Sequence, residues 1–273
     1  MSHELTSPHN SKIKEGIKLK ERRCRDQTGL FLIEGYRELK QAAENGLVFQ
    51  RLFICEDFFL GVNEPALIDF IADLGAEIYR CSSAIFEKLS YRDRPDGLVG
   101  VAVQMKQKLP VLMATLSHNP FLLIAEAIEK PGNLGTMLRS ADAAGVEGVI
   151  VCDRCTDIYN PNVVRASVGT LFTQPVIEAS GRETLLSLQE KKIKVVAATP
   201  SAKIDFTDAD FTGAVAIVVG TEQLGLSDPW MHCADIKVRI PMQGKADSLN
   251  VAVATTLLLY EVIRQRKGPQ LWK

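Results

Sequence analysis

Five short runs of apolar and β-branched residues in the second half of the chain constrain its fold more than any other feature. Runs of this kind are typical of strands that helices cover on both faces of a parallel sheet. Helical segments separate them, and the last and longest is Ser248–Lys267. We therefore predict an α/β fold built on a parallel sheet. The predicted strands are Phe121–Ala127, Gly148–Cys152, Lys194–Thr199, Ala214–Val219 and Ile236–Ile240.

The first half of the chain shows a second alternation of strands and helices, over residues 29–104. Its glycines fall where elements should end, since Gly35 follows a strand and Gly46 and Gly75 follow helices. This alternation predicts a small α/β domain of its own. The predicted strands are Leu30–Ile33, Gln50–Cys55, Glu77–Arg80 and Leu98–Gln104, and the predicted helices are Tyr36–Asn45, Pro65–Leu74 and Ser83–Leu89.

Two prolines, Pro110 and Pro120, punctuate the stretch between these halves, which is therefore the best candidate for a domain boundary. A chain of 273 residues also has the length for one large domain or two modest ones. We predict a basic N-terminal leader (1–26), a first domain (27–106), a linker (107–118) and a second domain (119–273).

Composition excludes several classes of protein. With 46% hydrophobic and 24% charged residues the chain can bury a core, so it is not disordered throughout. A net charge of −1 argues against a polybasic protein. No apolar run is long enough to span a membrane and the start has no signal-peptide pattern, so we expect a cytoplasmic protein with reduced cysteines.

The leader gathers positive charge that the net charge conceals. Residues 1–25 hold seven basic and three acidic side chains, a local balance of +4. Helical spacing predicts an amphipathic basic helix after Asn10. It is either a solvated surface helix or an arm that contacts the phosphates of a ligand. The candidate phosphate-contacting residues are Lys12, Lys18, Arg22 and Arg23.

Three glycine-containing segments follow predicted strands, where ligands bind in open α/β sheets. The first holds Asn133 and Arg139, the second Gly220 and Glu222, and the third follows Ile240. Spacing alone also allows a purely structural role for each segment. These are a helix capped by Asn133 with a salt-bridged arginine, a solvated carboxylate at Glu222, and capping of the last helix by Asp247, Ser248 or Asn250.

Cysteine spacing gives little support for a metal site. Cys152 and Cys155 would need two further ligands, and only His232 with Cys233 offers a candidate pair. We therefore expect no metal.

The joint wording of the three segments is more specific than any one of them. They read Asn133-Leu-Gly with Arg139, then Val218-Val-Gly-Thr-Glu with Gly225-Leu-Ser, then Ile240-Pro-Met with Ser248-Leu-Asn-Val-Ala-Val-Ala. In this order they closely resemble the three motifs of the SpoU-type RNA ribose methyltransferases of the SPOUT, or α/β-knot, superfamily. The first half resembles the ribosomal-protein-like, substrate-binding domain of that family.

The resemblance implies an S-adenosylmethionine-dependent transfer of a methyl group to a ribose 2′-hydroxyl of RNA, with a trefoil knot around the cofactor. It favours large-subunit, 23S-type ribosomal RNA. A transfer RNA 2′-O-methyltransferase and a non-catalytic RNA-binding module for ribosome assembly are the alternatives. The implied cofactor-binding residues are Thr199, Gly220, Ile240, Met242 and Leu249.

By the same resemblance, Arg139 is the catalytic arginine and Asn133, Glu222, Ser248 and Asn250 shape the pocket around it. Arg165 matches a recurring arginine that binds RNA phosphate, unless it forms a surface salt bridge. Members of the family form homodimers through the knot domain. The apolar face of the last helix is either core or dimer seam, and spacing does not decide between these. It consists of Val251, Ala254, Leu258 and Val262.

Overall fold

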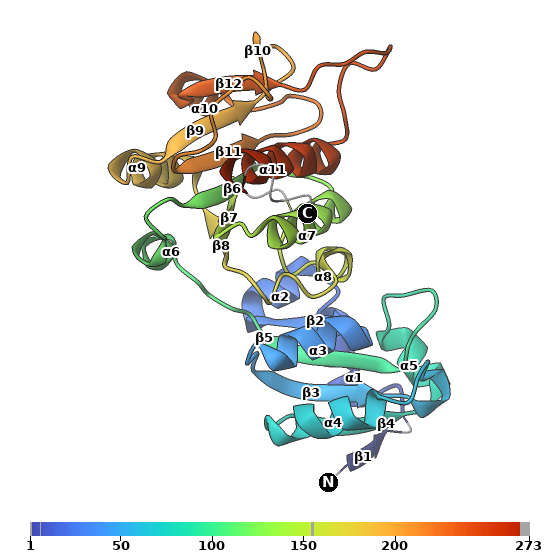
Figure 1. Ribbon diagram of the computed structural model, residues 1–273. Coiled ribbons are helices and arrows are strands. Elements are labelled where there is room, and N and C mark those ends of the chain that lie inside the picture. Colours follow the sequence, from blue (N-terminus) through green and yellow to red (C-terminus); the bar gives the residue numbers. More distant parts are fainter. Residues whose placement is uncertain (1, 6, 154–155, 268–273) are drawn as a thin grey trace. The chain divides into compact units, whose positions relative to one another are not determined.

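A computed structural model describes residues 2–5, 7–153 and 156–267 (Figure 1). The chain forms two compact units, which do not follow each other in simple order. Unit 1 combines residues 1–105 with residues 157–173, and unit 2 combines residues 106–156 with residues 174–273. Residues 157–173, which sequence placed in the second domain, thus pack with the first.

Unit 1 is built around a five-stranded sheet in the order β1-β4-β3-β5-β2, in which β5 runs antiparallel to both of its neighbours. The seven elements predicted over residues 29–104 are present. Its strands are β1 (Ser2–Leu5), β2 (Leu30–Glu34), β3 (Phe49–Ile54), β4 (Glu77–Cys81) and β5 (Leu98–Val103). Its helices are α1 (Ser11–Lys18), α2 (Arg22–Thr28), α3 (Tyr36–Glu44), η1 (Glu56–Phe58), α4 (Glu64–Asp73), α5 (Ser83–Leu89) and α8 (Pro161–Ser167).

The predicted leader is an integral part of unit 1. Its helix α1 begins after Asn10, whose side chain accepts a hydrogen bond from the backbone N–H of Lys12 at 2.8 Å. Ile13 is fully buried in the core. Arg25 is only 1% exposed and pairs with Asp157 at 2.6 Å, so one of the seven basic side chains is neutralised inside the unit.

Unit 2 confirms the predicted parallel sheet, with seven strands in the order β10-β12-β9-β11-β6-β7-β8. Sequence reasoning missed β8 and β10. The strands are β6 (Phe121–Glu126), β7 (Gly148–Cys152), β8 (Val176–Ala179), β9 (Lys194–Ala198), β10 (Ile204–Asp205), β11 (Val215–Val219) and β12 (Ile236–Arg239). The helices are α6 (Leu109–Thr115), α7 (Pro131–Ala144), α9 (Gly181–Glu190), α10 (Asp228–Cys233) and α11 (Val251–Lys267).

Two predictions about the connecting segments need correction. The stretch 107–118 is not an open linker, because α6 lies in it and buries Leu109, Leu112 and Met113 in the core of unit 2. The last helix begins at Val251 and not at Ser248. None of the described helices is long and apolar enough to cross a membrane.

Strands β6 and β11 lie side by side at the centre of the sheet of unit 2, where the strand order reverses. At their carboxyl ends the buried Glu126 accepts a hydrogen bond from the backbone N–H of Ser227 at 2.9 Å. At their amino ends Arg266, on α11, donates to the carbonyl oxygens of Pro120 at 2.9 Å and Gly213 at 2.7 Å. Both ends of the β6–β11 pair are therefore fixed by charged side chains.

Candidate active site

A hydrogen-bonded cluster of side chains lies beyond the carboxyl ends of β6 and β11. One carboxylate oxygen of Glu222 accepts hydrogen bonds from Asn133 at 2.9 Å and from Asn250 at 2.8 Å. The other oxygen is paired with Lys130. Asn250 also donates to the side-chain oxygen of Asn133 at 3.1 Å. Three segments far apart in sequence thus converge at the point where parallel α/β sheets bind ligands.

The turn after β11 presents Glu222 to this cluster. Thr221 and Gly225 exchange backbone hydrogen bonds of 3.1 Å, and the Thr221 hydroxyl accepts from the N–H of Leu224 at 2.9 Å. Gly225 has φ +70°, which a glycine adopts without strain. A Cβ atom at Gly220 would collide with the carbonyl of Gly225. The two glycines therefore allow the tight turn that holds Glu222 in place.

The hydrogen bonds of the cluster determine the charge of Glu222. The hydrogen bond from Lys130 lowers the pKa of this carboxyl group below its usual 4.5, and the one from Asn133 acts in the same direction. Glu222 is therefore a carboxylate at neutral pH, and it accepts hydrogen bonds without being able to donate one. Its side chain is 27% exposed, so the cluster is open to a ligand.

The capping alternative is wrong for Asn133 and right for Asn250. Helix α7 starts at Pro131 after Lys130, so Asn133 lies within its first turn and directs its amide to Glu222. Asn250 caps α11 through a 3.0 Å hydrogen bond from the N–H of Ala252. Its side-chain oxygen thus accepts from the helix while its nitrogen donates to the cluster.

Ser248 is exposed in the loop before α11 and, among the described residues, makes no side-chain hydrogen bond to the cluster. Lys130 belongs to the cluster but was not identified from the sequence. A lysine between a buried strand and the proline that starts a helix, opposite a predicted carboxylate, was the available signal.

Arg139 stands apart from these contacts. It lies on α7 with an exposed side chain, and within the described residues it forms neither a hydrogen bond nor an ion pair. The alternative that Arg139 forms a salt bridge is therefore wrong within the described residues. Its guanidinium group is free to contact a ligand.

The predicted cofactor-binding residues gather along one edge of the same sheet. Thr199, Gly220 and Ile240 each follow a strand, and these strands, β9, β11 and β12, are neighbours. Met242 and Leu249 are half-buried in the loop that leads to α11. Across the described residues, the backbone of 240–249 makes no backbone–backbone hydrogen bond. Free backbone groups beside half-buried apolar side chains fit a ligand with an adenine ring and an aliphatic chain.

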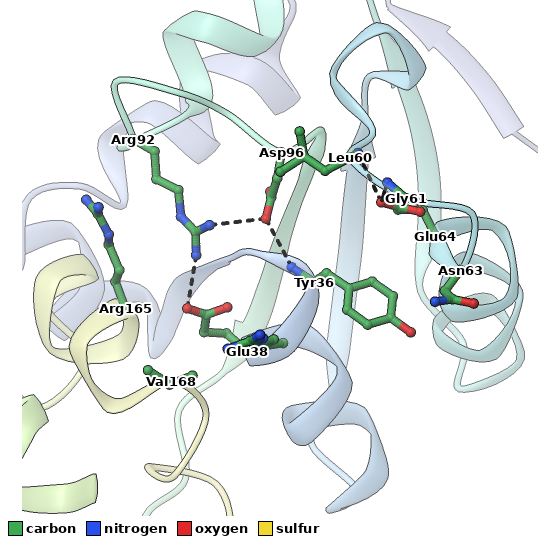
Figure 2. Close-up of a pocket in the computed structure, with 11 residues that line it drawn as sticks. Tyr36, Glu38, Leu60, Gly61, Asn63, Glu64, Arg92, Asp96, Arg165 and Val168 are labelled. Atoms are coloured by element: carbon green, nitrogen blue, oxygen red, sulfur yellow. Dashed lines mark hydrogen bonds and ion pairs between the residues drawn. The ribbon is translucent and has the colours of Figure 1, made fainter.

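The predicted RNA-binding residues lie in unit 1. Arg165 is exposed on α8, and it lines a pocket together with Arg37 (Figure 2). In the leader, Lys18, Arg22 and Arg23 are exposed and Lys12 is half-buried. Arg22 lies 3.6 Å from Asp26. This arrangement fits both a solvated surface helix and a phosphate-contacting arm, so both readings stay open.

The absence of a metal site remains a prediction. Among the described residues no group of three potential metal ligands comes together. Cys155 lies outside the described residues. Burial raises the pKa of Cys152 to about 12, so this thiol stays protonated in the core and is a poor metal ligand.

Comparisons with known proteins point to one family. A family model described as SpoU rRNA Methylase matches residues 120–260, and an MRM3-like substrate binding domain matches residues 10–100. The 23S rRNA (guanosine(2553)-2′-O)-methyltransferase RlmP of Bacillus subtilis is 27% identical over 95% of this chain and 98% of its own.

Solved structures agree over nearly the whole chain. An RNA 2′-O ribose methyltransferase is 41% identical, with a TM-score of 0.83 over 98% of this chain and 100% of its own. The SpoU methyltransferase AviRb of Streptomyces viridochromogenes, in complex with the cofactor AdoMet, is 29% identical. Its TM-score is 0.85 over 94% of this chain and 99% of its own.

Proposed function

Because the chain belongs to the SpoU rRNA methylase family and is an S-adenosylmethionine-dependent RNA ribose methyltransferase, we propose that it methylates a 2′-hydroxyl of large-subunit ribosomal RNA. The observation that carries this proposal is the cluster of Asn133, Glu222 and Asn250. It joins the three segments that carry the family motifs, at the carboxyl ends of β6 and β11.

The cofactor supplies an electrophilic methyl group when bound. We propose that the loops after β9, β11 and β12 hold it, with Thr199, Gly220 and Ile240 at the strand ends and Met242 and Leu249 against its apolar parts. The unpaired backbone groups of 240–249 would bond its adenine edge. The trefoil knot of the family is proposed for this segment as well.

A ribose 2′-hydroxyl is a very weak acid, so its oxygen gains negative charge as the methyl group arrives. We propose that Arg139 donates hydrogen bonds to this oxygen. A guanidinium group with a pKa above about 12 is an awkward base, and it acts better as a stabiliser of negative charge. The proton would pass to an RNA phosphate. Such a contact is worth about 3–4 kcal/mol in the transition state, or 10²–10³ in rate.

The cluster positions the groups around this oxygen. Glu222 accepts from both asparagines, so the two amides have fixed orientations before any ligand binds. Preorganised polar groups lose no free energy to reorganisation during the reaction. Ser248 is exposed and lies two residues before Asn250. We propose that it closes the pocket over the ribose.

Ribosomal RNA is the favoured substrate because unit 1 matches a substrate-binding domain and a full-length relative is named for 23S rRNA. Arg165 and the leader residues Lys12, Lys18, Arg22 and Arg23 would contact its phosphates. Transfer RNA is the second candidate substrate. We place the protein in the cytoplasm, where both RNAs occur.

We also propose a homodimer formed through unit 2. Of the apolar face predicted on α11, Val251, Leu258 and Val262 are buried and Ala254 is half-buried, so this face is core. The large hydrophobic residues of α11 that are exposed lie on another face, and they are Val253, Leu257 and Tyr260, at 49%, 41% and 38%. They recur at helical spacing, so they form one apolar stripe suited to a second copy.

Mapping 2′-O-methyl groups on total RNA with and without the gene tests the proposal. One modification in large-subunit rRNA should disappear and return with the wild-type gene but not with Arg139→Ala. Loss of a transfer RNA modification would establish the second candidate. An unchanged map, together with no calorimetric heat on addition of S-adenosylmethionine, would instead establish a non-catalytic RNA-binding module.

A further inference from the structure

Unit 1 contains a pocket of about 530 Å³ that lies outside the site proposed for methyl transfer. Its walls come from the start of α3, the loop before α4, the loop before β5 and helix α8 (Figure 2). All of its lining residues belong to unit 1, whereas the cluster around Glu222 belongs to unit 2. The pocket is thus a separate site, and its exposed charges indicate what it binds.

The carboxylates that line the pocket are buried and bonded within its walls. Those of Glu38 and Asp96 pair with Arg92 at 3.0 Å and 3.1 Å, and Figure 2 shows Arg92 bonded to both. The carboxylate of Glu64 accepts hydrogen bonds from two backbone N–H groups of the loop before α4, at 3.2 Å and 2.9 Å. These groups hold the walls together, and the charge of Arg92 is offset by its two acidic partners.

Two arginines supply the exposed charge of the pocket. Of the charged residues that line it, only Arg37 and Arg165 are exposed, and within the part of the chain that the structure describes neither has a hydrogen-bond or ion-pair partner. Most arginines of unit 1 are instead paired with a carboxylate: Arg22, Arg25, Arg51, Arg80 and Arg92. A guanidinium group without an acidic partner is free to bind a phosphate through two parallel N–H groups.

The fold brings these two arginines to one pocket from distant parts of the sequence. Gly169, which follows α8, has φ +90°. A Cβ atom at this position would lie 2.7 Å from the side chain of Gln41 and 3.5 Å from the carbonyl oxygen of Arg37. The chain after α8 therefore packs closely against α3, and a glycine permits both the conformation and the close approach. Arg37 on α3 and Arg165 on α8 thus present two positive charges to the same pocket.

We infer that this pocket binds the sugar-phosphate backbone of RNA, with phosphates on Arg37 and Arg165. RNA presents a phosphate at every nucleotide, so one strand can supply an acceptor to each of two guanidinium groups. Phosphate contacts carry no sequence information, so this site positions the RNA and leaves the choice of nucleotide to other contacts. The inference rests on the proposed RNA substrate, and it adds Arg37 and the pocket to the surface that holds this substrate.

The test measures binding of a labelled oligouridine to the full-length protein by fluorescence anisotropy over a range of salt concentrations. Each phosphate contact with a single strand contributes about 0.7 to the slope of log K against log salt concentration. Arg37→Gln and Arg165→Gln should each reduce the slope by this amount and weaken binding about fivefold at about 0.1 M salt. The double variant should lose about twice as much slope. Wild-type slopes in the folded variants, verified by circular dichroism, would overturn the inference, and if one variant does not fold the other decides.

Arg80→Gln is the matched control, because it makes the same substitution elsewhere in unit 1. Arg80 is exposed on β4, pairs with Glu56 and does not line the pocket. This variant should keep the affinity and the salt slope of the wild type. An equal loss in Arg80→Gln and Arg37→Gln would show that the total charge of the protein acts and not the pocket, which would contradict the inference.

Two further comparisons identify the ligand. Oligocytidine binding should weaken by the same factor as oligouridine binding in each variant, because the contacts are to phosphate, and a loss confined to one base would overturn the backbone assignment. Inorganic phosphate should compete with oligouridine no better than chloride at equal ionic strength. Stronger competition by phosphate that disappears in the double variant would show a site for a free anion and overturn the assignment to RNA.

The inference and the proposed function can fail separately. Calorimetric binding of S-adenosylmethionine should be the same in Arg37→Gln and wild type, because the pocket and the proposed cofactor site belong to different units. Reduced salt slopes in the variants, without methyl transfer by the wild type, would refute only the proposed function. Methyl transfer by the wild type, with unchanged salt slopes in the variants, would refute only the pocket.

Discussion

The buried ion pair between Arg25 and Asp157 gives the sharpest stability prediction. The two side chains are 1% and 2% exposed, so both charges are removed from water. Arg25 donates to Asp157 through Nε at 2.8 Å and Nη2 at 2.6 Å, and through Nη1 to the carbonyls of Leu19 and Lys20 at 2.8 Å. Arg25→Met would remove all of these bonds and leave the carboxylate of Asp157 buried, with the N–H of Tyr159 as its one remaining donor among the described residues.

Removing one partner of such a pair costs about 3–5 kcal/mol, because the remaining charge is uncompensated. Domains are stable by about 5–15 kcal/mol in total, so the variant should lose a large part of the stability of unit 1. We expect its melting transition to fall by about 10–15 °C. Circular dichroism measures this fall, and hydrogen exchange should show residues 157–173 losing protection.

The same helix provides a matched control. Arg22 lies near Asp26, with both side chains over 40% exposed, and such a surface pair contributes about 0–1 kcal/mol. Arg22→Met should therefore melt close to wild type. The double variant Arg25→Met/Asp157→Leu should recover part of the loss, because no charge remains buried. If the free energy of unfolding of Arg25→Met lies within about 1 kcal/mol of that of Arg22→Met, the pair does not hold residues 157–173 to unit 1.

Three further predictions concern unit 2. Arg139→Ala should lower the methyl-transfer rate about 10²–10³-fold while calorimetric binding of S-adenosylmethionine stays intact, and wild-type turnover would remove Arg139 from the mechanism. Lys130 lowers the pKa of Glu222, so the carboxylate stays ionised as the pH falls to the usual 4.5 and its contacts are lost only below that. Lys130→Met should move this titration upward in carbon-13 NMR, and an unchanged titration would contradict the assigned cause. Leu257→Glu should give monomers in light scattering, whereas Leu186→Glu, at a still more exposed leucine on another helix, should not.

Periodicity predicted the regular elements because burial on both faces leaves a clear signature. The run Gly148–Cys152 is fully buried and its predicted limits match the strand. The two missed strands of unit 2 carry less of that signature. Strand β8 has four residues with an exposed Glu178, and β10 has two residues. Short strands at the sheet edge bury too little apolar surface to show in the sequence.

Pro110 and Pro120 led to the wrong interpretation of residues 107–118 as a linker. Pro110 occupies the first turn of α6, where a helix needs no N–H from it. A proline therefore marks the start of a helix as readily as a linker. The buried Leu109, Leu112 and Met113 recur at helical spacing, which was the signal that favoured a helix.

In the candidate site, too, the sequence predicted the residues but not the contacts that the fold creates between them. Motif wording identified Asn133, Glu222 and Asn250, but no local pattern indicated that Asn250 would both cap a helix and contact Glu222. The pairing of Arg25 with Asp157 spans 132 positions, and charge counting treats both as surface groups.

That long-range pair changes where RNA recognition should be sought. It holds residues 157–173 in unit 1, so Arg165 lines a pocket with Arg37 although it lies in sequence between the methyltransferase motifs. A residue that contacts RNA from unit 1 should affect RNA affinity without affecting cofactor binding in unit 2. Arg165 and Arg139 are therefore expected to differ in kind, the first acting through substrate affinity and its salt dependence, the second through the rate of methyl transfer.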